Sequence, residues 1–289
     1  MASYQLIWNG HRLELGTRTA IMGVINVTPD SFSDGGKFFK CEDAVAQGIT
    51  LYEDGADIID IGGESTRPFS DPLSADEESD RVLPVIEKLA ARMPVPISID
   101  TTKAVVARRA LEAGASMIND VSSLRMDPEL VEVAAEYGVP VVLMHMKGTP
   151  KDMQVSPRYD HLVDEIRSFL AAAVERAVKG GVSRKKLIVD PGIGFGKTFQ
   201  HNLTLINRLS EFKSLGLPLL VGPSRKAFIR NLLKDGDLSD IDPQLPIVET
   251  GTQAAVAAAA LNGAHVVRVH DVASTLATVK IIDAIRNAR

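Results

Sequence analysis

The chain of 289 residues lacks what several protein classes require. Its one cysteine, Cys41, excludes an internal disulfide, and we expect a reduced thiol in a cytoplasmic protein. No apolar run approaches the roughly 20 residues that cross a bilayer, and the first residues, MASYQLIWNGHRLELG, show no signal-peptide pattern. The formal net charge of −5 offers no basic footprint for nucleic acid or for an anionic membrane. We therefore expect an intracellular globular protein.

Aromatic residues are also scarce, at 5% of a chain that is 45% hydrophobic, so Ala, Val, Ile and Gly dominate the apolar content. This composition suits helices packed on a parallel sheet. Near the N-terminus, residues 5–15 alternate around Asn9-Gly10, a dipeptide typical of a type I′ turn, and predict a β-hairpin within residues 1–17.

Eight short apolar runs with little alternation follow the hairpin, as expected of strands covered on both faces. They are residues 19–27, 56–63, 94–100, 115–120, 139–146, 186–192, 217–222 and 264–270. Helical patterns occupy residues 42–55, 75–93, 103–114, 128–138, 161–181, 199–216, 225–236, 252–263 and 272–289. The alternation predicts an α/β fold, a (β/α)₈ TIM barrel in one domain over 1–289, with the hairpin closing its bottom. No G-x-G-x-x-G follows the first run, which argues against a doubly wound dinucleotide fold.

Polar side chains stand where these runs end, and in a (β/α)₈ barrel that end forms the active site. They are Asn26, residues 64–67, Asp100, Asn119, Asp120, His145, Asp190, residues 224–226, Arg268 and His270. Each alone has a plainer interpretation: Asp100 or Asp120 as a helix N-cap, His145 as a core histidine, Arg268 as a surface ion-pair partner. Together they favour a polar ligand, because several charged groups buried at one mouth must be paired or bound.

The residue types describe that ligand. Asp100, Asp190 and Asn119 suit a flat, NH-rich heterocycle, since a carboxylate can accept two parallel hydrogen bonds from an N–C–N edge. Lys226 offers a donor to the ring. A second group, Asn26, Arg268, His270 and the hydroxyls of the first two loops, suits phosphate with a divalent cation.

The stretch GIGFGKT, residues 192–198, looks like a phosphate-binding loop. The pattern G-x-x-x-x-G-K-S/T would require glycine at position 191, which is Pro191, so we reject a Walker A site. Glycines 192, 194 and 196 are instead interpreted as letting the backbone approach a ligand closely.

Eight motifs occur in order at the predicted strand ends: MGVINVTPDSFSDGG, GADIIDIGGESTRP, SIDT, IND, LMHMKGTP, DPGIGFGKT, VGPSRK and RVHDV. In this series the chain resembles the dihydropteroate synthases. The resemblance implies condensation of 6-hydroxymethyl-7,8-dihydropterin diphosphate with 4-aminobenzoate to 7,8-dihydropteroate and pyrophosphate, in folate biosynthesis. It also implies Mg²⁺ and a homodimer formed through late helices such as 272–288.

The resemblance assigns roles to individual positions. It implies a pterin set of Asp100, Asn119, Asp190 and Lys226; a diphosphate set of Asn26, Thr66, Arg268 and His270, with Asn26 also at the metal; and an aminobenzoate set of Phe32, Thr66, Pro68 and Phe195. Asp100, Lys226, Arg268 and His270 are the expected catalytic residues. The loop 25–36 is interpreted as a catalytic lid whose Phe32 covers the second substrate.

Two positions depart from the family pattern: Phe69 stands where the family usually has glycine, and Ala227 where it often has serine. We expect them to alter the affinity for sulfonamides more than the reaction. Two other functions remain open on the sequence alone. A pterin-binding corrinoid methyltransferase would share the ring-binding acids, and a non-catalytic pterin-binding protein would not need Asn26, Arg268 and His270.

Overall fold

The structure, a computed structural model, describes residues 2–28, 37–65, 72–236 and 239–288. The predicted site residues Phe32, Thr66 and Pro68, the departure at Phe69 and most of the predicted lid lie outside these ranges. Arg67, one of the candidate residues at the strand ends, also lies outside them. Every other residue of the predicted pterin, diphosphate and aminobenzoate sets lies within them.

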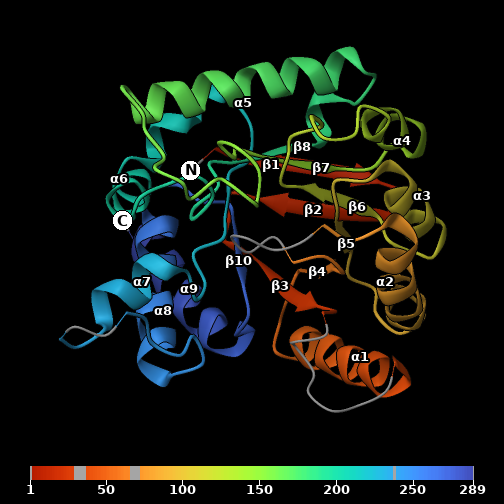
Figure 1. Cartoon of the computed structure of the whole chain (residues 1–289), viewed down its shortest axis with the longest axis horizontal. Helices are drawn as coiled ribbons and strands as arrows, with labels where there is room; N and C mark the ends of the chain where they lie inside the picture. The colour runs from red at the N-terminus through yellow and green to blue at the C-terminus, as the bar shows by residue number, and fades with distance from the viewer. Residues whose placement is uncertain (1, 29–36, 66–71, 237–238, 289) are drawn as a thin grey trace.

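Eight parallel strands form the centre of the molecule (Figure 1). The sheet runs in the order β8-β7-β6-β5-β4-β3-β10-β9, and a parallel bridge between Val189 and Leu219 connects the last strand region to the first. The strands are β3 (Ala20–Asn26), β4 (Ile58–Gly62), β5 (Ile97–Asp100), β6 (Met117–Asp120), β7 (Val141–Met144), β8 (Leu187–Asp190), β9 (Leu220–Val221) and β10 (Val266–Val269). The predicted barrel is confirmed.

Helices flank the strands on the outside and cover the outer face of the sheet (Figure 1). Side chains of the strands themselves fill the interior of such a barrel and cover its inner face. This explains why the strands are apolar throughout: all five residues of β4 are buried. The helices are α1 (Lys37–Glu53), α2 (Ala75–Ala90), α3 (Ala104–Glu112), α4 (Leu130–Tyr137), α5 (Leu162–Lys179), α6 (Phe199–Asn207), α7 (Ala227–Leu233), α8 (Pro246–Leu261) and α9 (Val272–Asn287), with 3₁₀ segments η2 (Arg184–Lys186) and η3 (Leu209–Leu215).

Three predicted helices had clearly wrong bounds. The helix predicted at 42–55 is α1, which begins five residues earlier, at Lys37. The pattern at 199–216 divides into α6 and η3, with Arg208 between them outside regular helical geometry. The pattern at 252–263 belongs to α8, which already begins at Pro246 because proline is well suited to the first turn of a helix.

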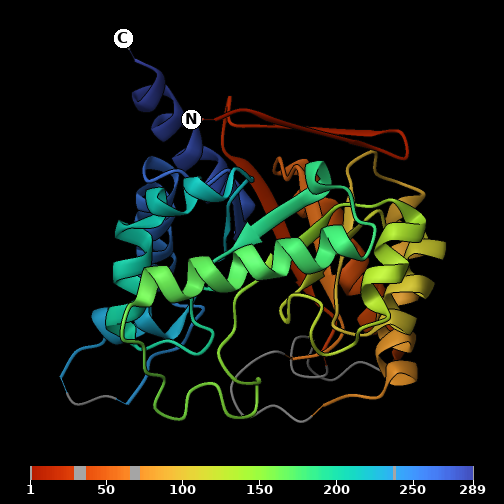
Figure 2. The same cartoon turned by 90° about the horizontal axis from the view of Figure 1, so that it is seen from above.

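The hairpin consists of β1 (Tyr4–Trp8) and β2 (His11–Leu15), joined by Asn9-Gly10, both with positive φ as a type I′ turn requires. The Trp8 indole donates a 2.7 Å hydrogen bond to the carbonyl of Ser116, which directly precedes β6. Figure 2 shows the hairpin across the end of the barrel opposite the long loop that follows β7. The hairpin therefore covers the N-terminal ends of the strands, as predicted.

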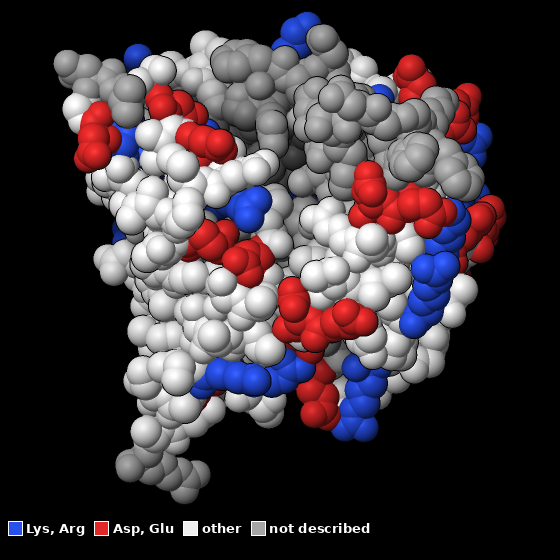
Figure 3. Space-filling view, turned by 90° about the horizontal axis from the view of Figure 1, so that it is seen from below, with Lys and Arg blue, Asp and Glu red and all other residues white. Residues whose placement is uncertain are grey.

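On the face in Figure 3, acidic and basic side chains are interspersed rather than gathered into one basic patch. Within the described ranges, no helix combines the length and the apolar character needed to cross a membrane.

Candidate active site

Arg268, on β10, is the centre of a charged cluster inside the barrel. Its Nε donates to Asp60 Oδ2 at 2.6 Å, and its Nη2 donates to Asp100 Oδ2 at 2.7 Å. The Asn119 amide donates to the same Asp60 oxygen at 3.0 Å. Four side chains from β4, β5, β6 and β10 are thereby connected near the carboxyl ends of their strands. Arg268, expected at the diphosphate, thus also contacts the residues expected to bind the pterin.

Sequence reasoning missed Asp60. It lies inside the apolar run 56–63, and its side chain is fully buried. One signal could have found it, because a carboxylate within a buried strand must have a partner. Its second oxygen, Oδ1, is buried and has no hydrogen-bond partner among the described residues. That oxygen can accept a hydrogen bond from an N–H group of a ligand.

Asp190 ends β8 on the neighbouring part of the mouth. Its Oδ1 accepts a 2.7 Å hydrogen bond from the Gly192 backbone N–H. Burial raises the pKa of Asp190 to about 6, although the Gly192 N–H and nearby cations oppose the shift. Burial likewise raises the pKa of Asp100 to about 7 against the opposing effect of Arg268. Burial removes much of the solvation of both carboxylates, so ligand N–H donors would favour their ionised forms.

Lys226 follows β9 and begins α7. Its Nζ lies 4.2 Å from the centroid of the Phe195 ring, a cation–π contact. Burial and the nearby Arg268 lower the pKa of Lys226 to about 8. Phe195, predicted in the aminobenzoate set, is buried in a small cluster with Val121 and three methionines. The structure thus places a predicted aminobenzoate residue directly against a predicted pterin residue.

The glycines after β8 have a role within the chain itself, and their role toward a ligand stays a prediction. All three have positive φ. A Cβ on Gly192 would lie 2.0 Å from the His145 carbonyl oxygen, and one on Gly196 would lie 2.5 Å from the Lys147 carbonyl oxygen. A Cβ on Gly194 would come within 3.1 Å of Lys226. These glycines let the 192–196 loop pack against the end of β7 and against Lys226.

Some of the remaining strand-end residues belong to the candidate site, and others stabilise the fold. The His270 Nδ1 lies 2.9 Å from Ser224 Oγ, which fixes the imidazole beside the loop after β9. Asn26 is half-buried at the end of β3. Neither aspartate that could have been a helix N-cap serves as one. Asp120 accepts hydrogen bonds from Ser122 and from the Leu124 N–H, so it stabilises a turn. Asp100 instead accepts a hydrogen bond from Arg268.

The rejection of a Walker A site is supported. Lys197 is buried, and its Nζ lies 3.0 Å from His145 Nδ1. The Thr198 hydroxyl accepts from the His201 N–H and caps α6. Both side chains are therefore engaged within the protein.

Lys103 connects the second and third loops. Its ammonium donates to the carboxylates of Glu64, after β4, and Glu78, on α2. The other oxygen of Glu64 accepts from the Leu73 N–H at 3.0 Å. Residues on both sides of the 66–71 segment are thereby joined.

A family model for pterin-binding enzymes matches residues 22–270. The chain belongs to this family. It is 47% identical over 270 residues to the dihydropteroate synthase of a Synechocystis species, covering 93% of this chain and 91% of the relative.

Two solved structures from Xanthomonas albilineans extend the comparison. A dihydropteroate synthase with 4-aminobenzoic acid has a TM-score of 0.90 and 42% identity, with each chain fully covered. A complex with 7,8-dihydropteroate has a TM-score of 0.84 and 41% identity, covering 96% of this chain and 97% of that one. The sequence-based assignment to the dihydropteroate synthases is confirmed.

Proposed function

We propose that this enzyme condenses 6-hydroxymethyl-7,8-dihydropterin diphosphate with 4-aminobenzoate, forming 7,8-dihydropteroate and pyrophosphate. The observation that carries the proposal is the buried cluster of Asp60, Asp100, Asn119 and Arg268, in which Asp60 Oδ1 still lacks a partner among the described residues. A flat ring with several N–H groups matches these acceptors. The Xanthomonas complexes with 4-aminobenzoic acid and with 7,8-dihydropteroate support 4-aminobenzoate as one substrate and 7,8-dihydropteroate as the product for this chain.

At the pterin end, Asp190 has one oxygen committed to the Gly192 N–H. Its other oxygen is suited to an N–H of the pterin ring. Lys226 supplies a donor for a ring carbonyl or nitrogen, and the Phe195 ring contacts its ammonium through a cation–π interaction. Burial around these groups makes each hydrogen bond with the ring stronger than it would be in water.

At the diphosphate end we propose Asn26, Arg268 and His270, together with Thr66. The hydrogen bonds of Arg268 to described residues use Nε and Nη2, which leaves Nη1 for a phosphate oxygen. The described residues contain no cluster of three or more His, Cys, Asp or Glu side chains that could hold a metal. Mg²⁺ commonly binds through one or two protein oxygens plus substrate phosphates, so the single amide oxygen of Asn26 fits it. When bound there, Mg²⁺ would neutralise charge on the leaving pyrophosphate.

The residues fit a dissociative reaction, since none is an activated nucleophile. The bond between the pterin methylene carbon and the diphosphate oxygen breaks, and its electron pair leaves on pyrophosphate. Arg268 and His270 stabilise that developing negative charge. The ionised carboxylate of Asp100 stabilises the positive charge left on the pterin. The nitrogen of 4-aminobenzoate then forms the new bond to the methylene carbon and releases a proton.

We also propose a homodimer formed through the late helices. Large apolar side chains are exposed there, among them Ile281 and Ile285, one turn apart on α9, at 63% and 60%. Leu261 at the end of α8 is 50% exposed.

The free thiol of Cys41 supports a reducing compartment such as the cytoplasm.

The direct test is pyrophosphate release by the purified protein. Release should require the pterin diphosphate, 4-aminobenzoate and Mg²⁺ together, and Asp190→Ala should abolish pterin binding. Absence of release with all three present would overturn the proposal.

A further inference from the structure

Lys197 is a buried lysine without a directly bonded carboxylate among the described residues. Its side chain is only 2% exposed. The ammonium contacts three neutral acceptors: His145 Nδ1 at 3.0 Å, the Phe195 carbonyl at 2.9 Å and the His145 carbonyl at 3.4 Å. Its three N–H groups are thus satisfied, but its charge is not balanced by any of these contacts. A buried charge needs a compensating charge nearby.

Asp190 supplies that charge from the adjoining strand end. The backbone N–H of His145 donates to the Asp190 carbonyl at 2.9 Å, which places β7 and β8 in register at this point. The Asp190 carboxylate raises the pKa of Lys197, while burial lowers it to about 7. In return, Lys197 lowers the pKa of Asp190.

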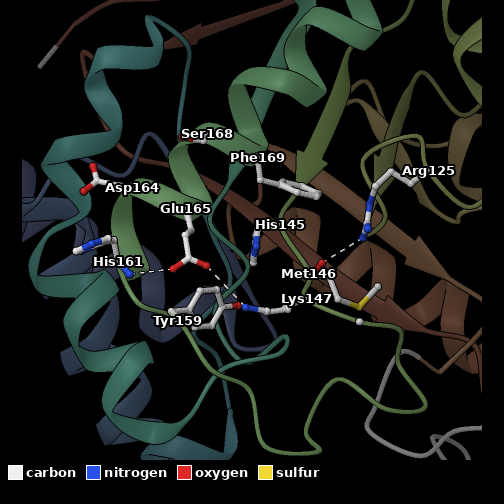
Figure 4. A pocket seen from close by; sticks show the side chains of 11 residues that line it. Arg125, His145, Met146, Lys147, Tyr159, His161, Asp164, Glu165, Ser168 and Phe169 are labelled. Carbon is white, nitrogen blue, oxygen red and sulfur yellow. Dashed lines mark hydrogen bonds and ion pairs between the residues drawn. The ribbon is translucent and has the colours of Figure 1, made fainter.

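His145 is a neutral acceptor for this ammonium. Burial and the charge of Lys197 lower the pKa of His145 to about 2, so Nδ1 carries a lone pair. Figure 4 shows the imidazole at the back of a groove beside α5, with Phe169 and Tyr159 next to it. The Phe169 ring packs edge-on against it, with the ring centroids 4.7 Å apart. The aromatic packing fixes the imidazole, and the imidazole fixes Lys197.

We propose that Lys197 is a positioning residue of the pterin end: its ammonium holds the 192–196 loop through the Phe195 carbonyl and keeps positive charge behind Asp190. This proposal rests on the proposed function, because it assigns Lys197 to the recognition of the pterin by Asp190.

Other charged groups also face these residues. Lys226 and Arg268 face Asp190, Lys226 faces Lys197, and Arg125 and Lys147 face His145. Asp100 and Lys226 titrate in the same pH range as Asp190. The informative quantity is therefore the difference between the two pH profiles, from which these shared titrations cancel. That difference should shrink above about pH 7, because Lys197 itself then loses its proton.

The test is the affinity of the full chain for 6-hydroxymethylpterin, measured by calorimetry from pH 5.5 to 7.5, with Lys197→Met compared to the original protein. An opposite charge at short range shifts a carboxyl pKa by about one unit or more. A one-unit rise for Asp190 would weaken binding about fivefold at pH 6 and less than about 1.5-fold at pH 7.5. An unchanged profile, or an equal loss at every pH, would overturn the proposal.

Tyr159→Phe is the matched control. The Tyr159 hydroxyl donates a 2.8 Å hydrogen bond to the Gly196 carbonyl, so it anchors the same loop without charge. Its removal should leave the midpoint of the profile unchanged. Pyrophosphate affinity should be the same in all three proteins, which shows that the rest of the site is folded.

A double variant, Lys197→Met with His145→Leu, makes the buried pair apolar. It replaces Lys197→Met in the comparison of pH profiles if the single variant does not fold. It should show the same shifted profile, and an unshifted profile would count against the proposal. If the original protein binds no 6-hydroxymethylpterin and releases no pyrophosphate, the proposed function fails. If it does both and only the shift is absent, the role of Lys197 alone fails.

Discussion

Asp60 offers the sharpest test of how the site is built. Its side chain is fully buried, and one of its oxygens accepts hydrogen bonds from both Arg268 and Asn119. In Asp60→Ala, Arg268 keeps only Asp100 as a carboxylate partner among these residues, and the Asn119 amide loses its acceptor. The substitution should therefore reduce both stability and activity.

The size of the effect follows from these contacts. Removing one partner of a buried ion pair typically costs about 3–5 kcal/mol. Since Arg268 retains its 2.7 Å bond to Asp100, we expect the lower end of that range, about 3 kcal/mol in the free energy of unfolding. Arg268 and Asn119 would also lose their fixed orientation, and a misplacement of about 1 Å in such groups lowers the rate about 100-fold.

Urea unfolding monitored by circular dichroism would measure the first effect, and aminobenzoate-dependent pyrophosphate release the second. The matched control is Asp76→Ala, because Asp76 also pairs with an arginine, Arg109, but its side chain is 85% exposed. The control should change the unfolding free energy by less than about 0.5 kcal/mol and leave activity unchanged. Equal stability of Asp60→Ala and the original protein, or near-normal turnover, would refute this account.

Three further predictions concern pH, assembly and the second substrate. Because the pKa of Asp100 is raised to about 7, the ligand-free protein loses stability as pH rises from about 4 to 7, a loss that Asp100→Asn avoids. The stability advantage of Asp100→Asn over the original protein should grow by about 3 kcal/mol between pH 4 and pH 8 in urea unfolding, and a constant difference would contradict the assignment. Ile281→Asp combined with Ile285→Asp should convert a dimer to a monomer in sedimentation velocity, whereas an unchanged sedimentation coefficient would argue against α9 as the interface. Ala227→Ser should lower the KM for 4-aminobenzoate about three- to tenfold, since one added hydrogen bond to a charged group contributes about 1 kcal/mol or more; an unchanged KM would remove position 227 from that subsite.

The barrel was predictable because its strands are buried on both faces, and that burial leaves continuous apolar runs such as β4. Helix bounds were less accurate where tertiary packing outweighs local pattern. Phe212, in η3, is fully buried and keeps the apolar pattern of 199–216 continuous, although the backbone changes geometry at Arg208. Nothing in the spacing of the apolar residues distinguishes those two geometries.

The candidate site was predictable as a set of strand ends, but its internal contacts were not. The period of two places Arg268, on β10, and His270, directly after it, on the same side, yet it does not reveal which carboxylates lie across the barrel. Asp60 was missed because an acid within an apolar run resembles a strand interior rather than a strand end. Lys197 was missed because a lysine in a glycine-rich loop after a strand resembles an exposed phosphate ligand, and the sequence does not show that its side chain is buried.

The buried carboxylates of the site are unfavourable for folding in a way that suits the proposed chemistry. Asp100 and Asp190 have raised pKa values because burial removes water from them, and Asp60 retains an unpartnered buried oxygen within the described structure. A pterin ring supplies N–H donors to these acceptors and thereby favours ionised carboxylates around it. In the proposed reaction, the same negative charges stabilise the positive charge on the ring once the bond to the diphosphate breaks, while Arg268 stabilises the leaving pyrophosphate. The same carboxylates and the same arginine therefore contribute both to binding the pterin and to breaking its bond to the diphosphate. This explains why the proposed reaction needs no side-chain nucleophile.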